Sequence, residues 1–252
     1  MSEALIYLVP GLFFLSSGAS VMNQVQENKF DALMKRTTRR PIPAGEISIP
    51  YAVLIAFLLI SAGALMLRMI GPVPAMLGLL NIVFYNLIYT PLKTRSWLAI
   101  FPGAVVGGVP PLIGWTSAGS FLFHPNALFL FIFVFLWQVP HFWLLMIKYG
   151  KDYEAAGFSS ITKFLNEKQI KIVVFWWGVV TSVFLMLFPL FGFYLKPLLI
   201  GILVVTNLFF IRQFYRYLFQ GESLQTVRNA FILINSYALI VFVLLIVNAL
   251  IS

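Results

Sequence analysis

Long apolar runs, separated by short polar segments, fill this sequence from end to end. Each run is long enough to cross a bilayer, because about 20 apolar residues span the hydrocarbon core as a helix. Together they predict eight membrane-spanning helices near residues 4–24, 47–68, 70–91, 97–118, 126–148, 172–194, 196–212 and 229–251. The pattern therefore predicts an all-α membrane protein made of a bundle of about eight transmembrane helices. A single polytopic domain over residues 1–252 is expected, because the length leaves no room for a separate soluble domain.

The composition excludes several classes of protein. Of the 252 residues, 61% are hydrophobic and only 10% are charged, which a soluble domain cannot bury. The absence of cysteine excludes disulfides, thiolate metal sites and a cysteine nucleophile. The net charge of +9 is better explained by membrane topology than by a nucleic-acid partner, and no nucleic acid is expected.

Lysine and arginine are distributed unevenly between the two sides of the predicted bundle. One side holds fifteen of them: Lys29, Lys35, Arg36, Arg39, Arg40, Lys93, Arg95, Lys148, Lys151, Lys163, Lys168, Lys171, Arg212, Arg216 and Arg228. The other side holds Arg68 and Lys196. Since basic residues gather in cytoplasmic loops, the fifteen residues predict the cytoplasmic face, with both termini on the opposite side. A bacterial inner membrane is the expected location.

Acidic residues are rare, and half of them lie in two segments on the predicted cytoplasmic side. Asn23, Glu27 and Asp31 are spaced i, i+4 and i+8, so on a helix they share one face. The second segment, after the fifth apolar run, contains Asp152 and Glu154. Mg²⁺ prefers oxygen ligands and is usually bound by one or two carboxylates plus substrate phosphates. The two acidic loops therefore predict a magnesium site that holds a diphosphate; the alternative is a polar, solvated helix end.

Basic residues surround both acidic segments. Lys35, Arg36, Arg39 and Arg40 follow the first segment, and Lys93 and Arg95 are predicted on the same face. Arginine binds phosphate through a bidentate fork, so one or two of these residues can neutralise a diphosphate. A purely topological role explains some of them equally well.

His141, Lys148 and Asp152 are spaced by seven and four residues. If the fifth helix continues past residue 148, they share one face, and His141 lies ~16 Å deeper than Asp152. A histidine at that depth is a candidate functional residue. The alternative is a histidine that is hydrogen-bonded to a neighbouring helix.

Aromatic residues make up 17% of the chain. Most of them are expected to fill the bundle or face lipid. If an allylic diphosphate ionises at the predicted site, however, it leaves a carbocation, which electron-rich ring faces stabilise. The rings closest to the charged face or to the helix-interrupting prolines are Tyr85, Tyr89, Trp115, Trp137, Phe142, Trp143 and Tyr153.

Five segments together resemble a known family. They are Asn23-x₃-Glu27-x₃-Asp31-Ala-x-Met34-x-Arg36-Thr37-x₂-Arg40-Pro41-x-Pro43, Tyr89-Thr90-Pro-Leu-Lys93, Gly108-Val-Pro-Pro-Leu-Ile-Gly114-Trp115, Trp137-Gln138-x-Pro140-His141-Phe142-Trp143 and Asp152-Tyr153-x₂-Ala-Gly157. The first and last resemble the two acidic motifs of the UbiA-type intramembrane prenyltransferases. The Met-x-Arg-Thr and Arg-Pro details resemble the haem-modifying branch, the protohaem IX farnesyltransferases (haem O synthases).

The resemblance implies a helix bundle around a central cavity, with Mg²⁺ as the cofactor at its cytoplasmic end. It implies that farnesyl diphosphate and water add across a vinyl group of haem b to give haem O and diphosphate. The implied metal ligands are Asn23, Glu27, Asp31 and Asp152, and the implied substrate-binding residues are Lys35, Arg36, Arg40, Lys93, Lys148 and Tyr153. His141 is expected, with Asp31 and Asp152, to be catalytic and to bind the porphyrin iron or orient the water. Haem A synthase or a terminal oxidase is the expected assembly partner.

The sequence departs from the family pattern in three places. The family usually has nine spans with the first motif after the second span, so this chain is expected to lack the family's first helix. Phe158-Ser-Ser-Ile-Thr replaces the Pro-Met pair often found after the second motif. Position 156 is alanine where other branches carry a second aspartate.

Three other functions fit parts of the sequence. The chain is also compatible with an enzyme of the same family that prenylates an aromatic acceptor, as in quinone or chlorophyll synthesis. The prolines within predicted spans and a weak similarity between the two halves are also compatible with a transporter. The shortened N-terminus is compatible with an inactive relative or an assembly factor.

Overall fold

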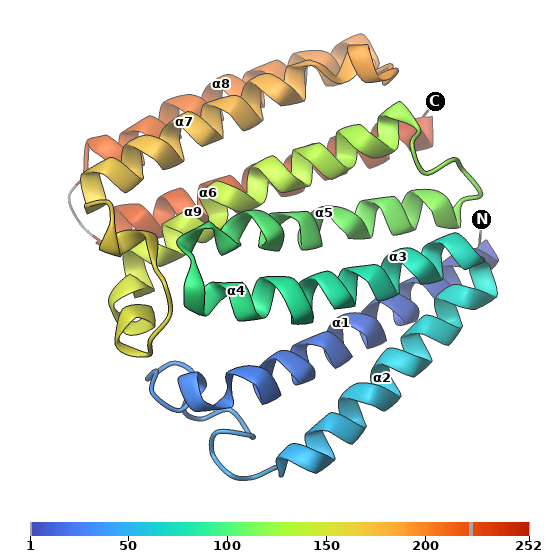
Figure 1. The fold of residues 1–252 in the computed structure, drawn as a ribbon. Coiled ribbons are helices and arrows are strands. Elements are labelled where there is room, and N and C mark those ends of the chain that lie inside the picture. The colour runs from blue at the N-terminus through green and yellow to red at the C-terminus, as the bar shows by residue number, and fades with distance from the viewer. Residues whose placement is uncertain (1, 222–223, 252) are drawn as a thin grey trace. The chain divides into compact units, whose positions relative to one another are not determined.

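The computed structural model describes residues 2–221 and 224–251, and within them all regular structure is helical (Figure 1). The α-helices in these ranges are α1 (Ser2–Asp31), α2 (Ile49–Ile70), α3 (Pro72–Val83), α4 (Thr90–Arg95), α5 (Ile100–Ser117), α6 (Pro125–Ala155), α7 (Glu167–Met186), α8 (Pro197–Phe219) and α9 (Leu224–Ile251). A π-helix, Phe84–Tyr89, joins α3 to α4. Short 3₁₀ turns occur at Trp97–Ala99, Ile161–Lys163 and Phe188–Phe191.

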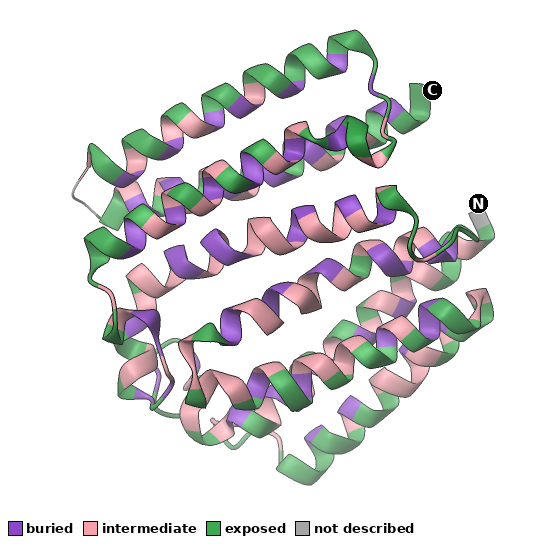
Figure 2. Ribbon diagram, turned by 45° about the horizontal axis from the view of Figure 1, so that its top comes forward, coloured by how far each residue is buried: buried purple, intermediate pink, exposed green. Residues whose placement is uncertain are grey.

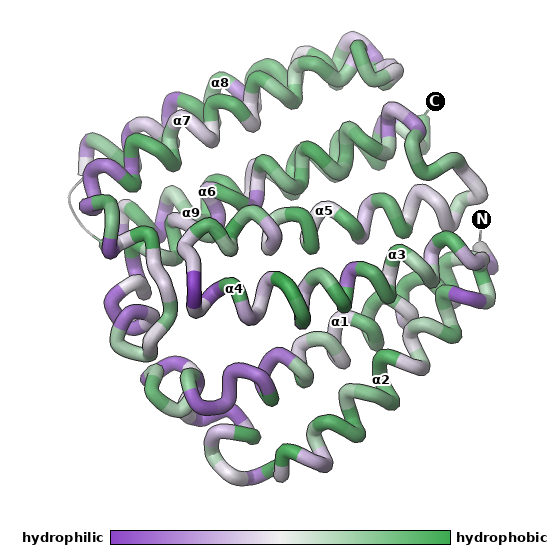
Figure 3. The backbone as a smooth tube through the Cα atoms, in the orientation of Figure 1, coloured by the Kyte–Doolittle hydropathy of each residue, from purple (hydrophilic) through white to green (hydrophobic). Residues whose placement is uncertain are grey.

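Eight helical segments of the described chain are long and apolar enough to cross a membrane, which confirms the predicted number of spans. The third of them, Pro72–Arg95, combines α3, the π-helix and α4. The helix bodies are hydrophobic, whereas polar residues collect at the C-terminal end of α1 and in the loop after it (Figure 3). Exposed positions are spread along the helices (Figure 2). They include large apolar residues such as Leu65, Val205 and Leu250, as expected of residues that face lipid.

Four predicted helix ends were wrong. α7 ends at Met186 rather than at residue 194, and α8 runs to Phe219 rather than to residue 212. α1 runs to Asp31 rather than to residue 24, and α6 runs to Ala155 rather than to residue 148. Glu27, Asp31 and Asp152 therefore belong to helices and not to loops. α1 continues because Asn23 and Glu27 find partners on neighbouring segments, which reduces the cost of their burial.

The chain forms two compact units. The N-terminal unit comprises Met1–Phe131 and Lys151–Ser160, and the C-terminal unit comprises Ile132–Gly150 and Ile161–Ser252. α6 thus contributes its first and last turns to one unit and its middle to the other. The expectation of one domain over the whole chain stays a prediction.

Glycines allow α1 and α2 to pack closely in the N-terminal unit. A Cβ added to Gly63 would lie 2.7 Å from the Gly11 carbonyl oxygen, and one added to Gly18 would lie 2.9 Å from the Ala56 oxygen. Small residues are the usual means by which membrane helices approach each other. Next to this contact, Leu15, Leu67, Ala75 and Ile113 form a buried apolar cluster that joins α1 to α2, α3 and α5. The helix that carries the first acidic motif is therefore firmly anchored.

The π-helix has a local cause in the sequence. Pro91 has no backbone N–H, and its ring would clash with the carbonyl of the residue four positions earlier. The wider turn avoids this conflict, and Thr90 N–H bonds to the Tyr85 oxygen. Single π turns of this kind occur often at functional sites. Here the π-helix faces the polar end of α1, as the hydrogen bonds from Asn86 to α1 show.

A buried polar cluster joins α7, α8 and α9 in the C-terminal unit. The Ser182 and Tyr237 hydroxyls donate to Asn207 Oδ1 at 2.8 and 2.6 Å, and Asn207 Nδ2 donates to the Ser182 carbonyl at 3.0 Å. The ring of Phe210 stacks on Tyr237, with the ring centroids 4.2 Å apart. Every polar atom of the Asn207 side chain is thus hydrogen-bonded.

Candidate active site

The first acidic motif lies on one buried face of α1, as its spacing predicts. The exposed fractions of Asn23, Glu27 and Asp31 are 7%, 6% and 0%. Carboxylates are almost never buried this far unless they are paired. The contacts of the two carboxylates therefore define what this face of α1 can bind.

Asp31 has one paired and one unpaired carboxylate oxygen. Arg40 Nη1 donates to Asp31 Oδ2 at 2.6 Å, while Asp31 Oδ1 is buried without a hydrogen-bond partner. The Thr37 hydroxyl donates to the Asp31 carbonyl oxygen at 2.8 Å and so folds the Met34–Arg40 turns back against the helix end. The turns between Asp31 and Arg40 therefore position Arg40 beside the Asp31 carboxylate.

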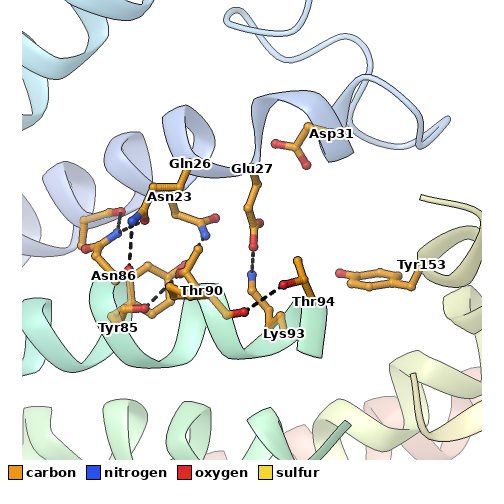
Figure 4. A network of polar contacts seen from close by, with 12 residues as sticks. Asn23, Gln26, Glu27, Asp31, Tyr85, Asn86, Thr90, Lys93, Thr94 and Tyr153 are labelled. Atoms are coloured by element: carbon orange, nitrogen blue, oxygen red, sulfur yellow. Dashed lines mark hydrogen bonds and ion pairs between the residues drawn. The ribbon is translucent and has the colours of Figure 1, made fainter. Parts of the chain in front are cut away.

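Glu27 is paired with Lys93, which comes from α4. Lys93 Nζ forms an ion pair with Glu27 Oε1, although the contact lacks the angle of a directional hydrogen bond (Figure 4). The ammonium group also lies over the rings of Tyr89 and Phe158, 4.9 and 5.8 Å from their centroids. Lys93 thus occupies a position between α1, α4 and the segment that follows α6.

A hydrogen-bond network joins α1 to the π-helix. Asn23 Nδ2 donates to Thr90 Oγ1 at 3.1 Å. Gln26 Nε2 donates to the Asn86 carbonyl at 2.9 Å, and Asn86 Nδ2 donates to Gln26 Oε1 and to the Ala19 carbonyl, both at 3.1 Å (Figure 4). Gln26 and Asn86 were not predicted from the sequence to belong to the site. The only signal for this network was Pro91, which requires the wide turn that carries Asn86.

The second acidic motif packs against the turns that follow α1. Arg36 Nη2 donates to the Tyr153 hydroxyl at 2.9 Å. Met34, Ala156 and Phe158 form a small buried cluster. Ser159 N–H donates to the Lys93 carbonyl at 2.9 Å. The structure therefore brings together the first motif, Lys93 and Tyr153, which lie far apart in the sequence.

Other predicted site residues are exposed. Lys35, Lys148 and Asp152 are exposed, and the Asp152 carboxylate makes no ion pair within the described chain. Lys148 Nζ lies over the Tyr149 ring, 4.8 Å from its centroid. Among residues 2–221 and 224–251, no three histidine, aspartate or glutamate side chains gather as a metal-binding group. A metal shared by Asp31 and Asp152 stays a prediction.

His141 belongs to the C-terminal unit, where it contacts α9. Its Nδ1 lies 2.9 Å from Asn235 Oδ1, and its ring is 4.8 Å from that of Phe231. Trp137, one turn earlier on α6, donates from Nε1 to the Ile234 carbonyl at 3.0 Å. The prediction that His141 shares a helix with Asp152 is correct, because α6 is continuous through both residues.

An apolar cavity of about 400 Å³ lies in the N-terminal unit between α1, α3 and α5. Its α1 wall includes Leu12, Ser16 and Ser20, which continue the helical face of Asn23 and Glu27 toward the N-terminus. Tyr85 of the π-helix also lines it. The cavity therefore adjoins the polar face of α1 with a space suited to an apolar group.

The side chains at the end of α1 fit a bound Mg²⁺. A buried carboxylate oxygen without a partner, Asp31 Oδ1, is a hard anionic ligand. Glu27 and Asn23 add two more oxygen-bearing side chains on the same face. Mg²⁺ often takes only one or two protein carboxylates, so two carboxylates on one helix face are enough to hold it.

The comparisons with known proteins match this architecture. The model of the UbiA prenyltransferase family matches residues 2–237, and the chain belongs to that family. A protoheme IX farnesyltransferase of Geobacter sulfurreducens is 40% identical over 72% of this chain and 67% of its own length. One of Flavobacterium psychrophilum is 34% identical over 82% of this chain and 70% of its own length. The alignments with the first five such relatives span 52% to 70% of those proteins.

Solved structures confirm the fold. A structure concerned with digeranylgeranylglyceryl phosphate synthase superposes with a TM-score of 0.80 at 16% identity, covering 100% of this chain and 88% of that one. A UbiA homologue from Archaeoglobus fulgidus, bound to GPP and Mg²⁺, superposes with a TM-score of 0.68 at 13% identity, covering 97% and 88%. At these identities the likeness concerns the fold alone.

Proposed function

We propose that the chain transfers a farnesyl group from farnesyl diphosphate to a vinyl group of haem b. The C1–O bond of the donor breaks, and its electron pair leaves with the diphosphate. The terminal vinyl carbon bonds to farnesyl C1, water adds to the other vinyl carbon, and one proton is released. The products are haem O and diphosphate. The similarity to protoheme IX farnesyltransferases supports the choice of both substrates.

The observation that carries the proposal is the arrangement around Asp31. A fully buried carboxylate with one unpaired oxygen lies beside Glu27 and is bordered by Arg40 and Lys93. Buried polar atoms without partners are rare in folded proteins and call for an explanation. A diphosphate bound through a cation supplies one, because it needs anionic ligands for the cation and basic residues for its own oxygens.

In this proposal Asn23, Glu27, Asp31 and Asp152 hold Mg²⁺. When bound, the ion stabilises the negative charge on the departing diphosphate as a Lewis acid. Arg40 and Lys93 neutralise the buried carboxylates before substrate binds and are close enough to the site to contact phosphate oxygens. Lys35 and Arg36 are exposed and can turn toward a diphosphate that enters from water, and Lys148, which is also exposed, stays a predicted substrate-binding residue. Tyr153 holds Arg36 through the 2.9 Å hydrogen bond.

The cavity between α1, α3 and α5 is proposed to take part of the donor's apolar chain. Its walls are largely apolar and it follows the same face of α1 as the acidic motif. Burial of apolar surface there removes it from water, at about 25 cal/mol per Å². Enclosure by the walls also keeps water away from an allylic cation, for which the Tyr85 ring offers an electron-rich face.

His141 is proposed to bind the iron of haem b or to orient the water that adds to the vinyl group. The site is proposed to lie on the cytoplasmic side of a bacterial inner membrane, because fifteen of the seventeen lysines and arginines are predicted on that side of the spans. Haem A synthase or a terminal oxidase stays the predicted assembly partner.

The direct test is incubation of the purified protein with haem b, farnesyl diphosphate and Mg²⁺, followed by mass spectrometry of the extracted porphyrin. The expected product carries one added farnesyl group and one added water. A parallel incubation replaces haem b by a hydroxybenzoate-type acceptor. Prenylation of that acceptor with unmodified haem would contradict the proposal and favour an aromatic-acceptor enzyme.

A further inference from the structure

Asn235 of α9 contacts His141 of α6 through its carboxamide. Asn235 Oδ1 lies 2.9 Å from His141 Nδ1, and Asn235 Nδ2 donates a 2.6 Å hydrogen bond to the Phe231 carbonyl. Phe231 is one turn earlier on the same helix. The amide thus connects the imidazole to the backbone of α9, and its two ends have different partners.

The two contacts fix the orientation of the amide. If the carboxamide were turned over, its oxygen would lie 2.6 Å from the Phe231 carbonyl oxygen, and neither atom carries a hydrogen. That arrangement is repulsive. Asn235 Oδ1 must therefore face the histidine, where it can only accept a hydrogen bond.

The orientation of the amide in turn fixes the tautomer of the imidazole. An acceptor 2.9 Å from Nδ1 requires that Nδ1 carry the hydrogen. In neutral His141 the lone pair then resides on Nε2. Nε2 makes no hydrogen bond within the described chain, and it is not among the fully buried unpaired atoms. His141 therefore offers an accessible Lewis base at the ring nitrogen that does not contact Asn235.

Neighbouring rings restrict the motion of the imidazole. Its centroid lies 5.2 Å from that of Trp137, 5.4 Å from Phe142 and 4.8 Å from Phe231. The Trp137 hydrogen bond to the Ile234 carbonyl joins α6 and α9 at the residue next to Asn235. The ring is held by contacts on several sides, so Nε2 has a defined direction.

We propose that Asn235 is a positioning residue that holds His141 as the Nδ1–H tautomer, so that Nε2 can ligate the iron of haem b. Histidine ligands of metals almost always donate their other N–H to an oxygen acceptor, which orients the ring and raises its basicity. Asn235 Oδ1 is such an acceptor. The identity of the ligand as haem rests on the proposed function.

The test is spectroscopic and uses the full chain. Purified wild type, His141→Ala, Asn235→Leu and Asn235→Asp are titrated with haem b, and resonance Raman spectra of the ferrous complexes report the iron–histidine stretching band. Asn248→Leu is the matched control, because it removes another buried, hydrogen-bonded asparagine of α9 that does not contact His141. Thermal unfolding shows which variants are folded.

We expect His141→Ala to lose the iron–histidine band and to regain a nitrogen ligand when imidazole is added. Asn235→Leu should weaken haem binding by about 10- to 100-fold and lower the stretching frequency. Asn235→Asp, whose charged acceptor is stronger, should raise the frequency. Asn248→Leu should leave the band unchanged.

Two results would overturn the inference, and they are distinguishable. If wild type farnesylates haem b but His141→Ala and both Asn235 variants keep its haem spectrum, the positioning role is wrong and the proposed function stands. If wild type neither modifies haem b nor shows a haem band, the proposed function fails and the inference fails with it.

Discussion

The two units each contain a buried polar cluster, and the clusters differ in whether their hydrogen bonds are complete. In the C-terminal unit, Asn207 pairs all its polar atoms with Ser182 and Tyr237. In the N-terminal unit, Asp31 Oδ1 and Asn86 Oδ1 are buried without partners. An unpaired buried acceptor costs about 1–3 kcal/mol, whereas a paired one is close to neutral or slightly stabilising.

We infer from this difference that the Asn207 cluster is structural and that the Asp31 cluster binds a ligand. The Asn207 cluster stabilises the packing of α7, α8 and α9 and offers no free group to a ligand. The Asp31 cluster keeps an anionic oxygen at a cost to stability, as residues of binding sites do. Substitutions in the two clusters should therefore change different measurable quantities.

The largest effect is expected for Asp31→Asn, which removes a charge with little change of volume. Prenyl transfer should fall by at least about 100-fold, since loss of even an outer partner of a metal ligand costs 10- to 100-fold. Thermal stability should change little, because the variant no longer buries a carboxylate. Steady-state kinetics and a thermal unfolding curve measure both quantities. Near-normal turnover in a folded Asp31→Asn protein would contradict the assignment.

Asn207→Leu should lower stability and leave turnover unchanged, which is the opposite of the result expected for Asp31→Asn. The Ser182 and Tyr237 hydroxyls would lose their acceptor, so the free energy of unfolding should fall by about 1–3 kcal/mol. Folded protein should keep its activity, because no atom of this cluster is assigned to the reaction. Unfolding in detergent, followed by circular dichroism, is the measurement. A fall in turnover with unchanged stability would show that the cluster acts in catalysis.

Gly63→Ala tests how firmly α1 must be held for the site to form. The added Cβ would lie 2.7 Å from the Gly11 carbonyl oxygen, so α1 and α2 must separate. We expect a loss of about 1–3 kcal/mol in stability, typical of overpacking. The matched control is Gly114→Ala, whose Cβ would meet no atom within 4 Å and should change stability by less than about 0.5 kcal/mol. Equal effects of the two substitutions would refute the close-packing account.

The smallest effect is expected for Tyr153→Phe. The variant keeps the ring contact with Phe158 but loses the 2.9 Å hydrogen bond from exposed Arg36. That bond contributes about 0.5–1.5 kcal/mol, so the KM for farnesyl diphosphate should rise roughly 2- to 10-fold. Turnover at saturation should stay near that of wild type, since the bond only orients a binding residue. A fall in kcat alone would instead assign Tyr153 to the chemical step.

The number and order of the spans could be predicted from hydropathy, because lipid imposes a strict length on each apolar run. The ends of the helices could not. α1 continues through Asn23 and Glu27 because their partners, Thr90 and Lys93, come from a distant part of the chain. A hydropathy pattern contains no information about such partners.

The candidate site could be predicted only in part, because residue spacing shows which side chains share a helix face but not which distant residues contact them. The i, i+4, i+8 spacing placed Asn23, Glu27 and Asp31 on one face, and the structure confirms this. Asn86 and Asn235 were not predicted, because a single asparagine within an apolar run gives no sign of its partner. The π-helix was also missed, although Pro91 was the local signal for it.

Binding of Mn²⁺ in place of Mg²⁺, followed by electron paramagnetic resonance in the presence of diphosphate, tests the central claim most directly. We predict that wild type binds the ion and that Asp31→Asn and Asp152→Asn each weaken binding by at least about 10-fold, independently of turnover. Equal Mn²⁺ affinity in wild type and both variants would contradict a metal–diphosphate site at the end of α1.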